Sequence, residues 1–414
     1  MLNRRTLLYP SNLKNWFLAA PSSSLYGHRF KRCPFDPLHR PCVSTWPASM
    51  IKKLKRWDCQ IPNFLSYLGI FSSFFLWTTA FCQEEAPHVP VSQTPDGRVN
   101  YPSNFQVEGG INLFLFGEYL YWIAGEDSLY YAHTGRGSGT TVVPPNGEIN
   151  FKGRLKKVKP EWDSGLRLGI GFNFPKEGYD AAFYWTWFST DRSNSVSNPE
   201  GTLFSIWAHP DNTATAADTF AKGKWNLNFN LLDLEWGRSS WFGGYFSLRP
   251  FFGVRELWLR QDLKNRYDYD TTPTTFGKLG AKSDFSGGGL RAGADARFAI
   301  PYGFSIYGIA SGSLLYGRFN ADFRLKENSF TIAQAKNHFW RGISSLQLAL
   351  GLGWDTHFFR DRLHIQFHIG WEQNEWFSVN QMSHFMQDVG SGVFFQENSN
   401  LSLQGLVAGG RFDF

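Results

Sequence analysis

The stretch Trp162–Phe174, WDSGLRLGIGFNF, decides the fold of this chain, because apolar and polar residues alternate along it. Its apolar set, interrupted by Ser164, is Trp162, Leu166, Leu168, Ile170, Phe172 and Phe174. The intervening set is Asp163, Gly165, Arg167, Gly169, Gly171 and Asn173. Successive side chains of a β-strand point to opposite faces, whereas a helix would mix the two sets. The segment is therefore predicted to be a strand with one apolar and one polar face.

The same alternation recurs in three later stretches, Leu290–Phe298, Leu346–Trp354 and Leu363–Trp371. A tilted strand of about 9–11 residues crosses a bilayer, with its apolar face toward lipid and its polar face toward the lumen. A soluble β-sandwich also alternates, but Tyr and Trp gather near the strand ends here, as in the aromatic girdles of membrane barrels. We predict an all-β, antiparallel transmembrane β-barrel of about 12 strands, within a range of 10 to 16.

The uncharged stretch Phe298–Gly317 is as long as a membrane-spanning helix, but it contains Pro301 and four glycines. Pro and Gly disfavour a helix interior, so a Pro-Tyr-Gly turn between two strands is predicted instead. Membrane barrels have short turns at one end and longer loops at the other. The longer loops are expected at Ser128–Glu148, Asp191–Glu200, His209–Ala221, Asp262–Asp284 and Phe377–Asn398.

The first 82 residues differ from the rest in charge. Of the 41 Lys and Arg and the 35 Asp and Glu, 11 bases and 2 acids lie in residues 1–82, which leaves 30 bases and 33 acids in residues 83–414. The basic character therefore belongs to the leader, and a nucleic-acid partner is not expected. All four cysteines also precede residue 83, so the main body has neither disulfides nor a cysteine nucleophile.

Residues 50–82 follow the pattern of a secretory signal peptide, with four basic residues after Met50 and then the uncharged stretch Ile61–Phe81. Cleavage is expected after Ala80 or Cys82. A retained membrane helix is the alternative, although Pro and Ser dilute the stretch. Residues 1–49 are expected to be an untranslated or dispensable extension, 83–107 a short polar segment and 108–414 the barrel.

The end of the chain alternates up to a terminal aromatic residue, through Leu406, Ala408, Gly410, Phe412 and Phe414. A last strand ending in Phe resembles the signal that bacterial outer-membrane barrels present to their assembly machinery. Phe412 and Phe414 are therefore the predicted assembly signal. Together with the signal peptide, this ending predicts export through the periplasm to the bacterial outer membrane, with lipid, lipopolysaccharide and the assembly machinery as partners.

Three segments resemble one family: FGEYLYW at Phe116–Trp122, the long stretch Pro160–Phe188, and LSLQGLVAGGRFDF at Leu401–Phe414. A fourth, Gly370–Met382, is also similar. The family is that of the pore-forming major outer membrane proteins of Legionella, also found in Chlamydia-like bacteria. The resemblance implies a porin that passes small polar solutes and ions by diffusion. The alternative is a surface adhesin or structural protein with a filled barrel; a homo-oligomer and contact with a host surface stay open.

Charged residues on the polar faces of the strands are the predicted pore lining, because they alternate with the residues that face lipid. They are Asp163, Arg167, Arg249, Arg255, Arg291, Asp295, Arg297, Asp355, His364, His368 and Glu372, together with the basic strip Lys152, Arg154 and Lys156. The strip has two interpretations, a basic wall that favours anions or a rim in contact with solvent or lipopolysaccharide.

Candidate sites for enzyme chemistry have simpler explanations. His364 and His368 would lie about 13 Å apart on a strand, too far to share a metal ion. The glycines at 135, 137 and 139 lack the strand-to-helix context of a phosphate-binding loop. Ser383 and His384 are adjacent in sequence, which is not the arrangement of a catalytic pair. The sequence therefore predicts no enzyme activity, cofactor or metal.

Overall fold

The computed structural model describes residues 101–105, 107, 109–136, 152–175, 177–197, 203–207, 218–269, 276–385 and 394–414. All of them belong to the compact unit Glu84–Phe414. The predicted extension 1–49, the predicted signal peptide 50–82 with its alternative of a membrane helix, and residues 83–100 of the polar segment lie outside the described residues. No helix in the described ranges is long and apolar enough to cross a membrane.

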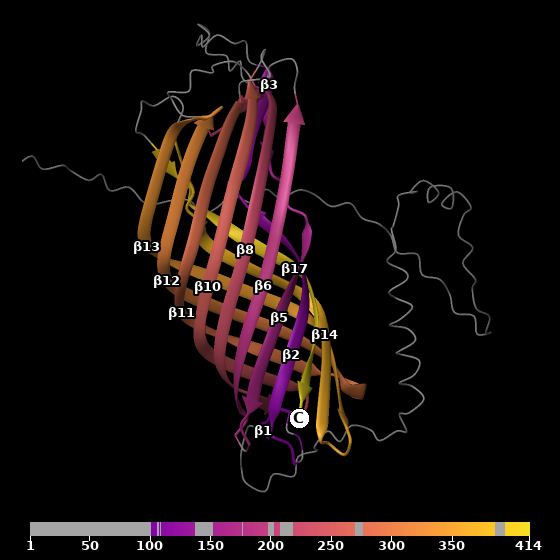
Figure 1. Cartoon of the computed structure of the whole chain (residues 1–414). Coiled ribbons are helices and arrows are strands. Elements are labelled where there is room, and N and C mark those ends of the chain that lie inside the picture. Colours follow the sequence, from indigo (N-terminus) through magenta and orange to yellow (C-terminus); the bar gives the residue numbers. More distant parts are fainter. Residues whose placement is uncertain are drawn as a thin grey trace, which may run out of the picture. The chain divides into compact units, whose positions relative to one another are not determined.

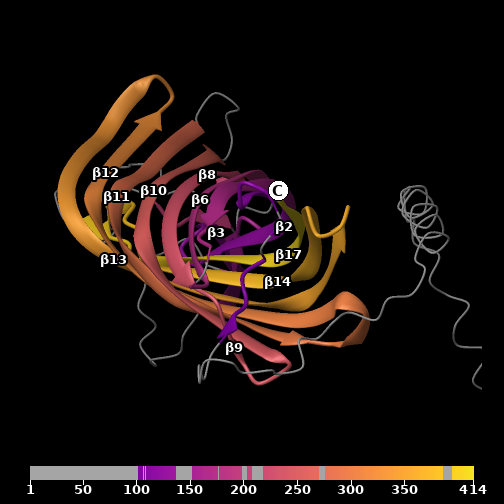
Figure 2. The same cartoon turned by 90° about the horizontal axis from the view of Figure 1, so that it is seen from below.

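Ten long antiparallel strands in the described part of the chain close into a barrel (Figures 1 and 2). In order around the ring they are β2 (Leu113–Glu126), β5 (Trp162–Asn173), β6 (Tyr179–Ser197), β8 (Asp218–Arg238), β10 (Phe246–Tyr269), β11 (Phe276–Ala299), β12 (Phe304–Glu327), β13 (Phe330–Phe358), β14 (Leu363–Asn380) and β17 (Ser399–Asp413). The last strand pairs with the first, from Leu401 opposite Glu126 to Asp413 opposite Phe114. This pairing closes the sheet over the lengths of β2 and β17.

The predicted all-β antiparallel barrel is confirmed, with ten strands where about twelve were expected. The count is lower because the strands are longer than a membrane crossing requires, up to 29 residues in β13. Short strands lie beside the ring or at its ends: β1 (Tyr101–Pro102), β3 (Tyr130–Arg136), β4 (Lys152–Lys157), β7 (Leu203–Ser205), β9 (Ser240–Phe242), β15 (Ser383–Phe385) and β16 (Phe394–Gln396).

The connections confirm one prediction and correct the expected loops. Strands occupy part of each loop: β3 lies in Ser128–Glu148, β8 begins within His209–Ala221, and β15 and β16 lie in Phe377–Asn398. Pro301–Gly303 forms a single 3-10 turn between β11 and β12, as the Pro-Tyr-Gly sequence predicted. The expected loops Asp191–Glu200 and Asp262–Asp284 are wrong, because β6 continues to Ser197, β10 to Tyr269, and β11 begins at Phe276. These ends are polar because their outward side chains stand in water, and a strand in water needs no apolar outer face.

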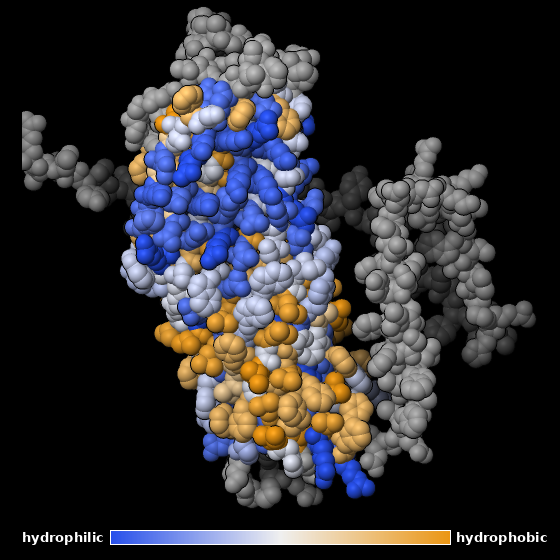
Figure 3. Space-filling view, viewed as in Figure 1, coloured by the Kyte–Doolittle hydropathy of each residue, from blue (hydrophilic) through white to orange (hydrophobic). Residues whose placement is uncertain are grey.

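Exposed apolar side chains lie on all ten strands of the barrel, and on the face shown in Figure 3 they form a belt around its lower part. On β12 it runs from Phe304 through Ile306 and Leu314 to Tyr316, and Arg318 is the next outward residue. Twelve residue steps of about 3.3 Å at a tilt of about 45° give roughly 28 Å, close to the hydrocarbon thickness of a membrane. Above the belt the same strands are hydrophilic on the outside (Figure 3).

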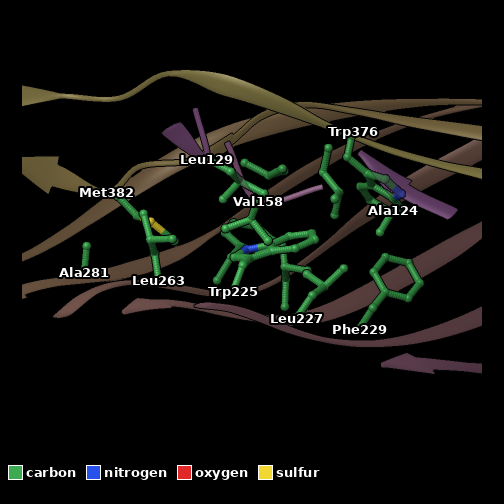
Figure 4. Packing of buried hydrophobic residues seen from close by; sticks show 14 of the residues in the cluster. Ala124, Leu129, Val158, Trp225, Leu227, Phe229, Leu263, Ala281, Trp376 and Met382 are labelled. Carbon is green, nitrogen blue, oxygen red and sulfur yellow. The ribbon is translucent and has the colours of Figure 1, made fainter. Parts of the chain in front are cut away.

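The polarity of the inward side chains also changes near the upper margin of the belt, in the opposite direction to that of the outward side chains. On β12 the inward residues are Ser311 and Ser313 within the belt, then Leu315 at its upper margin and Phe319 above it. The upper interior is a hydrophobic core that includes Trp225, whose neighbours are shown in Figure 4. The barrel is therefore apolar outside and polar inside at the membrane, and polar outside and apolar inside above it.

Candidate functional site

The lumen at the level of the belt holds a first ion-pair cluster centred on Arg167 of β5. Its guanidinium lies 2.5 Å from Glu118 of β2 and 2.8 Å from Glu372 of β14. His368 Nε2 lies 2.6 Å from the other oxygen of Glu118. Side chains from three strands therefore meet in one place, and the two carboxylates are less than a tenth exposed.

A second cluster joins the four neighbouring strands β6, β8, β10 and β11 on the inner wall. Arg249 binds Asp180 at 2.5 Å, Asp295 at 2.7 Å and Glu235 at 3.4 Å. Arg255 donates to both oxygens of Asp233, at 2.6 and 2.9 Å. Arg291 of β11 completes the cluster, since its guanidinium contacts Asp233 at 3.2 Å and also Glu235.

Gln347 of β13 connects the two clusters. Its amide nitrogen donates to Glu372 at 2.8 Å, while its amide oxygen accepts hydrogen bonds from Ser311 at 3.0 Å and from Arg291. Ser313 and Ser345 lie 2.6 Å apart beside it. A hydrogen-bonded path of buried side chains thus crosses the lumen from one wall to the other.

The lower end of the lumen is covered by the segment before β2. The ring of Phe105 stacks on His364 with centroids 3.7 Å apart, and the Asn173 amide donates to the Phe105 carbonyl at 2.9 Å. His364 Nδ1 lies 2.8 Å from Asp413, the inward residue next to the C-terminus. The guanidinium of Arg411 contacts the same carboxylate at 2.6 Å.

These contacts leave the described lumen occupied by side chains at three levels: the Phe105 segment below, the ion pairs in the middle and the hydrophobic core above. Barrels of about eight strands are filled by their own side chains, whereas porins of 16–18 strands leave an aqueous channel. A ten-stranded barrel is near the filled end of this range. The buried charges of the two clusters are tolerated because they have hydrogen-bonded partners of opposite charge.

Most of the predicted pore lining points into the barrel. The inward residues, each in contact with an acidic or basic partner, are Asp163, Arg167, Arg249, Arg255, Arg291, Asp295, Arg297, Asp355, His364, His368 and Glu372. The strip Lys152, Arg154 and Lys156 lies on β4, which among the described strands pairs with β3 alone and is not part of the ring of ten strands. Its residues therefore do not belong to the barrel wall. The side chain of Lys152 lies outside the described atoms.

The sequence prediction missed four acidic residues that complete the clusters: Glu118, Asp180, Asp233 and Glu235. The signal was present, since Asp233 and Glu235 alternate with Leu232, Leu234 and Trp236 in the run LLDLEW. It also missed the pairing itself, because the partners are contributed by strands far apart in the sequence.

The other candidate residues stand apart from one another. His364 and His368 have separate acidic partners, Asp413 and Glu118. Within the described ranges no group of three or more His, Cys, Asp or Glu side chains is arranged to hold a metal ion. Gly135 lies in β3, whereas residues 137 and 139 are outside the described ranges. Phe412 is on the outer side of β17, and the ring of Phe414, just after the strand, lies 5.7 Å from it between centroids.

Comparison with known proteins identifies a family and a group of similar folds. The model of the family described as Legionella pneumophila major outer membrane protein precursor matches residues 115–414. No protein with a curated description matches the chain. Among solved structures, the outer membrane protease OmpT of Escherichia coli is similar at 11% identity and a TM-score of 0.39, covering 75% of this chain and 99% of its own.

Two further structures belong to the same group. The translocator domain of the autotransporter NalP from Neisseria meningitidis has 12% identity and a TM-score of 0.28, with 74% of this chain and 90% of its own covered. A Pseudomonas aeruginosa FadL homologue has 6% identity and a TM-score of 0.23, covering 73% and 89%. Likeness at these values assigns neither a fold nor an activity to this chain.

The prediction that the chain is not an enzyme is corrected by this comparison. The sequence prediction excluded enzyme activity because it found no recognisable catalytic motif, yet an outer membrane protease is among the similar structures. Fold and function are separable, and catalytic groups can be placed on the same scaffold by residues that are distant in sequence. The likeness itself assigns no activity to this chain.

Proposed function

The chain belongs to the Legionella major outer membrane protein family, and we propose that this member is a surface-exposed binding or structural protein with a filled barrel. The observation that carries the proposal is the connected path of side chains from Glu118 through Arg167, Glu372 and Gln347 to Arg291. A solute crossing at this level would have to separate buried ion pairs. Breaking one partner of a buried pair costs about 3–5 kcal/mol.

The upper barrel supports a role at the cell surface. Outer-membrane barrels have short turns on the periplasmic side and longer connections outside. The tight turn Pro301–Gly303 and the end of β17 lie at the lower end, so the hydrophilic upper section projects from the cell. A wall that extends well beyond the belt offers a rigid outer surface for a partner, and a diffusion channel does not require it.

The same proposal includes the route to the membrane. The signal peptide 50–82 would direct export through the periplasm, and the outward ring of Phe412 would be available to the assembly machinery. Lipid would contact the belt, and lipopolysaccharide would contact its upper margin. Removal of Phe414 should reduce the amount of folded barrel in the outer membrane without changing the amount exported, as fractionation of cells would measure.

A diffusion porin is the second candidate, and one observation favours it. The inner wall at membrane level is lined with charged and hydrogen-bonding side chains, which suits small polar solutes better than apolar ones. Such a pore requires the Arg167 and Arg291 clusters to separate and the upper core to open. Ion and solute passage would then depend on these residues.

Single-channel recording in planar bilayers separates the two candidates. The protein is reconstituted after its folded state has been verified by resistance to unfolding in SDS without heating. The filled barrel predicts no discrete conductance steps in symmetrical salt. Regular steps that persist at low voltage would support the porin and contradict our proposal.

A further inference from the structure

Seven Lys and Arg residues within the described ranges form two rows across the outer face of the upper barrel. In the first row Lys222 of β8 lies opposite Arg266 of β10, which lies opposite Lys278 of β11, which lies opposite Lys326 of β12. In the second row Lys224 lies opposite Lys264, and Gly280 separates Lys264 from Arg324. We call these residues the basic face. They line a depression of about 410 Å³.

The basic face has the dimensions of an extended binding strip. Neighbouring strands are about 4.8 Å apart, so a row across four strands is roughly 15 Å long. The two rows are two residues apart along each strand, or about 7 Å. Next to Lys224 and Lys222 the outward residues of β6 are Ser193 and Ser195, which extend the rows with hydroxyl groups.

Like charges directly opposite each other on neighbouring strands destabilise a sheet. Three members of the basic face are offset by acids, Lys224 by Asp191 at 2.8 Å, Lys264 by Asp262 at 2.6 Å and Arg266 by Asp268 at 2.9 Å. Lys222, Lys278, Arg324 and Lys326 have no ion pair with any described residue. A strip with this surplus of positive charge is complementary to a polyanion.

The height of the basic face argues against membrane phosphates as its ligand. Lys326 is ten residues above Tyr316, the last apolar belt residue of β12, which corresponds to about 23 Å at a tilt of about 45°. The headgroup region adds only about 5–8 Å to each side of the hydrocarbon. The basic face therefore stands beyond the lipid phosphates, in the external medium.

We propose that the basic face binds a linear sulfated polysaccharide outside the cell. This inference rests on the proposed surface function and names its ligand class. Clustered Lys and Arg bind such chains through many weak contacts and through release of counterions, and the parallel rows let one chain contact several cations at once. Ser193 and Ser195 offer hydrogen bonds to sugar hydroxyls at one end of the strip.

Heparin is the probe for the test, with the full-length protein folded in detergent micelles and binding measured by calorimetry over a range of salt concentrations. The test variant is Lys222→Gln/Arg324→Gln/Lys326→Gln, which removes three cations that have no ion pair with described residues. The control variant, Arg154→Gln/Lys156→Gln/Lys159→Gln, removes three cations from β4 and the residues after it. We expect affinity to fall about ten-fold in the test variant and less than two-fold in the control.

The slope of log affinity against log salt concentration should also decrease by about two in the test variant, because fewer counterions are released. Absence of heparin binding, or an equal loss in both variants, would overturn the inference. Desulfated heparin that binds as tightly as heparin would also overturn it. So would lipopolysaccharide micelles that bind the native protein more tightly than heparin does and that the test variant no longer binds. The conductance of the same preparation is measured separately. A protein that does not bind heparin would therefore leave the proposal of a filled barrel unaffected.

Discussion

The lower half of the barrel contains ten strands, and six of them, β6, β8 and β10 to β13, continue into the upper half with opposite polarity. At the belt, β10 turns Phe252 and Val254 outward and Arg249 and Arg255 inward. A few residues later it turns Arg260 outward and Leu259 inward. The backbone hydrogen bonding is continuous through this change. The solvent outside each half therefore determines which face must be apolar, while the antiparallel pairing serves both.

The largest difference between the halves should appear when one charge is placed inside the upper half. Leu259→Lys puts an ammonium group into the hydrophobic core, where Leu259 is only 1% exposed. We expect a loss of about 5 kcal/mol or more in the free energy of unfolding, because the charge would be buried and unpaired. Guanidinium unfolding in lipid vesicles measures it, and Leu259→Ala, expected to lose about 2–5 kcal/mol, provides a variant that still folds.

The matched control is Ser286→Lys, since Ser286 is an outward residue of β11 next to Phe285, which pairs with Leu259. Its effect should stay within about 0.5 kcal/mol. Similar losses for Leu259→Lys and Ser286→Lys would mean that the upper half has no preferred apolar side, and the comparison of the halves would fail.

The next largest effect is expected inside the lower half, where charge is required. Arg291→Ala leaves Asp233 and Glu235 without one of their partners and should cost about 3–5 kcal/mol. The control is Lys224→Ala in the upper half, because both Lys224 and Asp191 are about half exposed and such a pair contributes about 0–1 kcal/mol. Equal losses in the free energy of unfolding for the two substitutions would show that water fills the lumen at this level.

The outer surface provides a third comparison along β13. Leu350 is 65% exposed within the belt, and Leu350→Lys should cost about 2–4 kcal/mol because it places a charge in hydrocarbon. Gln334 is an exposed outward residue of the same strand above the belt, and Gln334→Lys should change stability by less than about 0.5 kcal/mol. A larger loss of stability for Gln334→Lys than for Leu350→Lys would show that the belt lies elsewhere on the strand.

Much of this architecture could be predicted from the sequence and the rest could not, for a physical reason. WDSGLRLGIGFNF showed both faces of β5, because its apolar set faces lipid and its polar set faces the lumen. The run from Asp262 to Asp284 was interpreted as a loop, because a strand in water with a buried inner face was not considered. Partners such as Arg167 and Glu372 depend on strand register, which a single sequence does not specify when 205 residues separate them.

The smallest predicted effect concerns pH at the upper end. Burial lowers the pKa of His384 from its usual value of 6.5, and the carboxylate of Glu397 only partly opposes this. Since the folded pKa lies below the unfolded one, the unfolded chain binds the proton first, and stability is lost as the pH falls below about 6.5. His384→Gln should reduce that loss between pH 7 and pH 5. An unchanged pH profile in the variant would show that His384 is not responsible.

The measurement that tests the filled barrel most directly is the rate at which a charged, membrane-impermeant thiol reagent labels a single cysteine at position 311. The four native cysteines precede residue 83 and are first replaced by serine. Ser311→Cys is nearly isosteric and lies in the lumen at the level of the belt, where Ser311 is 5% exposed. References are Ser286→Cys, exposed to water, and Leu350→Cys, exposed to lipid. The filled barrel predicts that Ser311→Cys reacts as slowly as Leu350→Cys, and a rate close to that of Ser286→Cys would contradict it.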